Sequence, residues 1–145
     1  MITYDANRQP DALGWLAASE DDRIEAVRRY HRHLDEPHPK IPEPELHWTL
    51  HVTVENQFAM GADMPVQSTV ERLMADGLSR HDALHAVGFV LAGHLVRLVE
   101  GRDPGAAMVE YCRRLLTLTP ESWRREAAAE SAQHRRFRKR QRRSR

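Results

Sequence analysis

The chain has 145 residues, of which 30% are charged and 41% hydrophobic, a size and composition suited to one globular domain. Its single cysteine, Cys112, excludes an intramolecular disulfide and a zinc site built from cysteines. The amino terminus lacks the apolar stretch of a secretory signal, and the most apolar segment, residues 83–99, is interrupted by His85, His94 and Arg97. That segment falls short of a membrane span, so we expect a cytoplasmic protein without membrane contact.

The formal net charge of +1 combines two regions of opposite charge. Residues 134–145 hold seven arginines, one lysine and no acid, which leaves 14 basic and 21 acidic residues in the rest of the chain. A block of like charges predicts a disordered tail over these twelve residues. The functional alternative is an electrostatic, non-specific contact of Arg135 to Arg145 with nucleic acid or with an acidic partner.

Helix signals begin near the amino terminus, and strand signals are weak throughout, so the sequence predicts an all-α fold. Within residues 1–36, a short helix is expected from Pro10, and a second begins at Ser19, whose acidic neighbours form a capping box. This second helix should end near Asp35, because four prolines follow within eight residues. We therefore expect an extended connector over residues 37–43.

The next segment, residues 44–118, is predicted to be a helical core. Its helices should cover residues 43–60, 63–77 and 79–99 and continue with one that begins at Asp103-Pro104, each start marked by a cap or a proline. A last helix is expected over residues 119–133. The whole is then a single compact bundle of about five to six short helices with a disordered basic tail.

Histidines are the most informative residues, because eight of the nine lie between His31 and His94. At 100° per residue, with Leu46 at 0°, the side chains of His47, His51 and Glu55 lie at about 100°, 140° and 180°, inside the apolar arc of the helix 43–60.

The helix 79–99 repeats this arrangement. His81 and His85 share its packed side, where Gly88 and Ala92 leave space one and two turns later. His94 points away from this side and is excluded from the set.

Two His-x-x-x-His pairs on two core helices predict a metal site. Imidazoles at positions i and i+4 are neighbours on a helix surface and can reach one ion. Facing pairs then supply four ligands, His47, His51, His81 and His85, and Glu55 becomes a fifth ligand or a partner that orients a histidine. Such donors suit Zn, Fe, Ni, Cu or Mn.

Two alternatives remain open for these residues: a structural network of hydrogen-bonded histidines, and histidines exposed to solvent. His31, His33 and His38 could cover the site, although we favour a solvated surface group for them. The function favoured by the sequence is metal binding, and the alternative is a non-catalytic helical adaptor with a basic tail. If the protein is an enzyme, a metal-activated water with Glu55 as general base is the natural chemistry, but no substrate is indicated.

The same residues resemble a family of small bacterial helical proteins catalogued as domain of unknown function 1841. The resemblance covers Pro44 to Leu116 and is carried by three motifs: His47-Trp-Thr-Leu-His51 with Glu55 and Gln57, Pro65 with Val70-Glu-Arg-Leu73, and His81-Asp-Ala-Leu-His85. It implies a helical fold and a shared set of histidines, and no particular reaction. The family's central Glu-Gln pair is here Glu55-Asn56-Gln57, and its later carboxylates are absent after His85, which leaves Glu55 as the only obvious acid to bridge two metals.

Overall fold

The all-α prediction is confirmed by a computed structural model, which describes residues 1–35, 38 and 43–145. In this part of the chain there is no strand, and there are seven α-helices, slightly more than predicted, with one 3-10 helix. They are α1 (Ala12–Ala17), α2 (Glu20–Arg32), α3 (Pro44–Ala59), η1 (Gly61–Asp63), α4 (Val66–Ala75), α5 (Arg80–Val99), α6 (Pro104–Thr117) and α7 (Pro120–Arg143). The connector predicted over residues 37–43 lies outside the described residues, except for His38 and Glu43.

Helices begin where the sequence supplies a cap. The Ser19 and Ser79 side chains each accept a hydrogen bond of 3.1 Å from the backbone N–H three residues later, at the starts of α2 and α5. Gly77 ends α4 with φ of 105°, a conformation that favours glycine, and the Leu78 N–H reaches the Leu73 carbonyl at 3.1 Å. These local hydrogen bonds satisfy backbone groups that a helix end leaves without partners.

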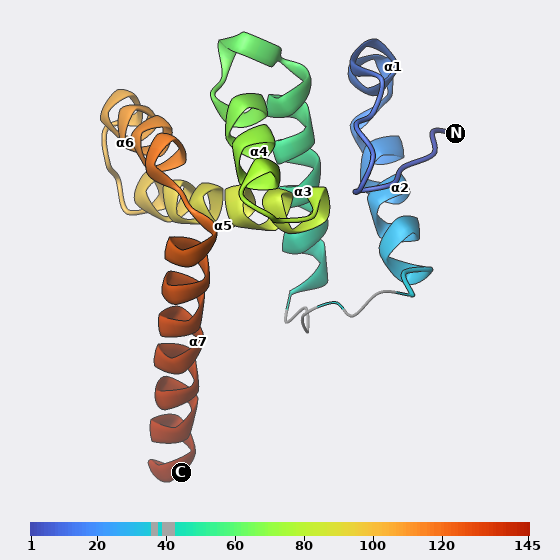
Figure 1. The fold of residues 1–145 in the computed structure, drawn as a ribbon. Helices are drawn as coiled ribbons and strands as arrows, with labels where there is room; N and C mark the ends of the chain where they lie inside the picture. The colour runs from blue at the N-terminus through green and yellow to red at the C-terminus, as the bar shows by residue number, and fades with distance from the viewer. Residues whose placement is uncertain (36–37, 39–42) are drawn as a thin grey trace.

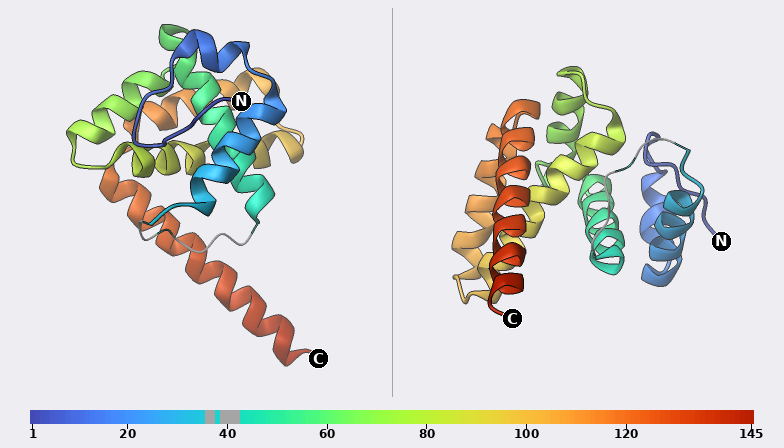
Figure 2. Two further views of the ribbon diagram at one scale, coloured as in Figure 1. Left: turned by 90° about the vertical axis from the view of Figure 1, so that its right-hand side faces the viewer. Right: turned by 90° about the horizontal axis from the view of Figure 1, so that it is seen from below.

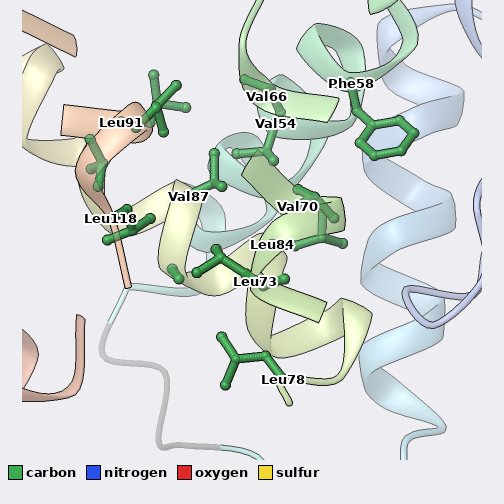
Figure 3. Packing of buried hydrophobic residues seen from close by; sticks show 14 of the residues in the cluster. Val54, Phe58, Val66, Val70, Leu73, Leu78, Leu84, Val87, Leu91 and Leu118 are labelled. Carbon is green, nitrogen blue, oxygen red and sulfur yellow. The ribbon is translucent and has the colours of Figure 1, made fainter. Parts of the chain in front are cut away.

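The core forms where α5 crosses α3 and α4 (Figure 1) and packs also against α6. Its side chains come mainly from these four helices, and Val87 on α5 and Val54 on α3 are fully buried within it (Figure 3). A smaller cluster joins α1, α2 and α3 through Trp15, Val27, Trp48 and Val52. Because α3 belongs to both clusters, it packs against both α2 and α5.

α5 is the one helix of the described residues that is long and apolar enough to cross a membrane, in contrast to the expectation that residues 83–99 fall short of a span. Its most apolar window has a mean hydropathy of 1.4, and 44% of that window is buried inside the protein. The buried side chains of Arg80 and His81 at its start, and its contacts with four other helices, are those of a core helix.

α7 corrects the prediction of a disordered tail over residues 134–145, because the helix continues to Arg143. It begins with a capping box between Thr119 and Ser122, and its arginines, alanines and glutamates favour helix. Cations in the last turn also interact favourably with the helix dipole, which offsets part of their mutual repulsion. All side chains from Gln133 onward are exposed, and this part of α7 extends away from the other helices (Figures 1 and 2).

Candidate metal centre

Six of the nine histidines gather where α2, α3 and α5 meet. The last turn of α2 contributes one ring, the segment before α3 another, and α3 and α5 contribute one i,i+4 pair each. We call this group the histidine cluster; its members are His31, His38, His47, His51, His81 and His85. The four histidines that the sequence paired on two helices therefore do lie together.

Ring nitrogens approach one another at distances typical of ligands around one metal ion. His31 Nε2 lies 3.3 Å from His47 Nε2 and 3.2 Å from His81 Nε2. His38 Nε2 lies 3.3 Å from His85 Nε2. Two overlapping groups of four rings have ligand atoms that all lie within 4.8 Å of one another: His31, His47, His51 and His85, and His31, His38, His81 and His85.

The outer nitrogen of His31 is fixed by the backbone of α2. His31 Nδ1 lies 2.9 Å from the carbonyl oxygen of Val27, which can only accept a hydrogen bond. Nδ1 therefore carries the proton, and the lone pair of the neutral ring is on Nε2, which faces the cluster. A backbone carbonyl that fixes the tautomer in this way is a common partner of a metal-ligating histidine.

Tyr4 sets which nitrogen of His51, Nδ1 or Nε2, carries the proton. The Tyr4 hydroxyl donates to Glu55 Oε1 at 2.6 Å and lies 3.0 Å from His51 Nδ1. Burial, followed by the charge of Glu55, raises the pKa of Tyr4 well above its usual value, so the hydroxyl keeps its proton and donates it in a hydrogen bond to Glu55. The hydroxyl oxygen then accepts from His51 Nδ1, which leaves the lone pair on His51 Nε2.

The environment of His51 Nε2 indicates that this atom binds a metal ion. It is buried and has no hydrogen-bond partner among the described residues. A buried polar atom without a partner costs roughly 1–3 kcal/mol, so native structures contain few of them. A cation among the ring nitrogens would satisfy this atom.

Glu55 lies beside the cluster rather than within either group of four. Its two carboxylate oxygens accept hydrogen bonds of 2.8 Å and 2.9 Å from the Arg80 guanidinium, and both residues are buried. Arg80 also donates to the Ala6 carbonyl at 3.1 Å. Glu55 was predicted to be either a fifth ligand or a partner that orients a histidine. The arrangement fits the second role, because Glu55 holds the Tyr4 hydroxyl that contacts His51.

The electrostatics of the cluster keep the rings of His47, His51, His81 and His85 neutral. Burial, followed by repulsion from neighbouring imidazoles, lowers the pKa of His47 to about 3 and that of His81 to about 4. The same causes lower the pKa of His85 to about 2 and that of His51 well below its usual value. Neutral imidazole is the form that binds metals, so these side chains need not lose protons at neutral pH.

His31 and His38 are the members of the cluster that sequence reasoning placed in a solvated surface group instead. The sequence did contain an indication for His31, because this residue follows the buried Val27 by one turn and so lies on the packed side of α2. His33 is exposed. His94 lies outside the cluster, in agreement with its predicted exclusion from the set, and is buried against Tyr111.

A groove of about 700 Å³ between α3, α5 and α7 leads to the cluster. His47 and His85 line one end of it, and Gly88 and Ala92 lie along it, where the sequence predicted free space. The groove provides a route by which an ion can reach the ring nitrogens. Comparison of the chain with family models, curated proteins and solved structures finds no match.

Proposed function

We propose that the protein binds a divalent transition-metal ion through the histidine cluster. The observation that carries this proposal is the convergence of six imidazoles at the junction of α2, α3 and α5, among them His51 with a buried Nε2 that has no partner. Neutral nitrogen donors of this kind suit Zn, Fe, Ni or Mn.

A purely structural histidine network explains the arrangement less well. The neutral His31 ring has one lone pair, on Nε2, yet the Nε2 atoms of both His47 and His81 lie within 3.3 Å of it. One lone pair in the plane of a ring cannot accept well from both neighbours. A cation bound by all three nitrogens removes this conflict.

The test is metal analysis of the purified protein together with calorimetric titration of the metal-free protein with Ni²⁺ and Zn²⁺. The double variant His51→Ala/His85→Ala removes two ligands and should lose measurable binding of both ions. The matched control is His33→Ala, which removes an exposed histidine outside the cluster and should bind as the unmodified protein does. Equal binding by all three proteins, or no binding by any, would refute the proposal.

A second candidate activity involves the exposed end of α7. We propose that residues 134–145, which carry eight positive charges and are all exposed, contact nucleic acid phosphates without sequence preference. The supporting observation is that α7 carries these exposed charges up to Arg143 along a helix that rises about 1.5 Å per residue. This activity is independent of the metal.

A further inference from the structure

The six rings of the histidine cluster have the neighbour relations of an octahedron. An octahedron has six corners, and each corner has four neighbours and one opposite corner. In the cluster every ring is in contact with four others, at centroid distances from 4.3 Å to 5.5 Å. All six rings belong to the described residues, and the pairs without such contact are His31 with His85, His38 with His51, and His47 with His81.

The distances between ring nitrogens agree with this arrangement. The three shortest, from 3.2 Å to 3.3 Å, all join rings that are neighbours in the octahedron. As octahedron edges they correspond to metal–nitrogen bonds of about 2.3 Å, and as tetrahedron edges to about 2.0 Å, close to the usual length for zinc. Bond length alone therefore allows both geometries, and the pattern of neighbours decides between them.

The two groups of four also fit a single octahedron. Both contain His31 and His85, and each adds two rings that are neighbours of each other. His31 and His85 are opposite corners of the octahedron, which explains why both belong to each group of four. The two groups of four cannot each hold a separate ion through His31, because His31 Nδ1 is hydrogen-bonded to the Val27 carbonyl and only Nε2 is left to bind a metal.

We infer that the cluster binds one divalent ion in a six-coordinate shell made entirely of histidine nitrogens; this inference rests on the function proposed above. The ions that fit are those that readily take six nitrogen ligands, such as Fe²⁺, Co²⁺ and Ni²⁺, in preference to tetrahedral zinc. A closed shell leaves no position for water or substrate. The site is therefore one for holding an ion, and it does not activate water.

The shape of this shell is tested with Co²⁺, whose visible absorption is weak when six-coordinate and intense when tetrahedral. The metal-free protein is loaded with Co²⁺, its stoichiometry is measured, and its spectrum is recorded before and after addition of azide, a small anion that binds to open positions. His38→Ala removes one corner from the segment before α3, and His33→Ala is the control. X-ray absorption of the Ni²⁺ form counts the imidazole ligands independently.

The expected result is one ion per chain, a weak spectrum that azide does not change, and six nitrogen ligands to Ni²⁺. His38→Ala should still bind, but more weakly than the unmodified protein, and its spectrum should respond to azide. An intense tetrahedral spectrum, two ions per chain, or an azide response in the unmodified protein overturns this inference while leaving metal binding intact. Failure to bind any ion overturns the proposed function itself.

Discussion

Replacing Tyr4 by phenylalanine should weaken metal binding without touching any ligand. The hydroxyl group of Tyr4 connects His51 Nδ1 to the carboxylate of Glu55. Without it, the proton on Nδ1 loses its acceptor, and His51 is free to turn or to move its proton to Nε2. Either change removes a lone pair from the cluster.

The magnitude follows from the contacts that are lost. Loss of partners that orient a metal-ligating histidine typically lowers metal affinity by roughly ten- to a hundredfold. Folding stability should also fall, by about 1–3 kcal/mol, because a buried Nδ1–H and a carboxylate oxygen each lose a hydrogen bond. The aromatic ring is retained and only the hydroxyl group is lost, so the change in packing is small.

Tyr111→Phe is the matched control for this experiment. Its hydroxyl donates to Gln57 at 2.6 Å, and its ring stacks on His94, outside the histidine cluster. Competition of each variant with a chelator for Ni²⁺ gives the affinity, and urea unfolding of the metal-free proteins gives the stability. Both variants should lose stability, but only Tyr4→Phe should lose affinity. Equal Ni²⁺ affinity of Tyr4→Phe and the unmodified protein would refute the role assigned to Tyr4.

Two further predictions concern acid and salt. The pKa values of His47, His81 and His85 are lower in the folded protein than the 6.5 of an exposed histidine, so the unfolded chain binds more protons below that pH. The metal-free protein should therefore lose stability as the pH falls below about 6.5, by up to about 1.4 kcal/mol per pH unit for each histidine; urea midpoints that stay constant from pH 7 to pH 5 would contradict this. Removal of residues 134–145 should abolish DNA binding at low salt while helical circular dichroism of the remaining helices and Ni²⁺ affinity persist, and binding by the full chain should fall steeply with added salt. Binding that survives truncation, or that ignores salt, would show that α7 is not the contact.

Much of the fold could be predicted because helix starts depend on neighbouring residues. Ser19, Ser79 and Thr119 each cap a helix with a hydrogen bond to a residue three positions away. The i,i+4 spacing likewise placed His47 with His51, and His81 with His85, on the packed sides of α3 and α5. Local geometry was sufficient for these features.

What the sequence did not reveal depends on contacts between distant segments. Tyr4 lies 47 positions from His51, and Arg80 lies 25 positions from Glu55, so no periodic pattern connects them. Glu55 follows His51 by one turn, which makes it a candidate ligand in the sequence. In the structure, both of its carboxylate oxygens instead accept hydrogen bonds from Arg80. The resemblance to the family of unknown function and the cytoplasmic location stay predictions.

The buried pair of Glu55 and Arg80 has a consequence for how an ion enters and leaves. Together with Tyr4 and the Ala6 carbonyl, it joins the amino-terminal segment to α3 and α5 by hydrogen bonds that need no ion. Many small zinc domains unfold when their metal is removed. Here hydrogen bonds among protein groups already join the segments around the rings, so we expect the polypeptide to keep its fold when the proposed ion leaves.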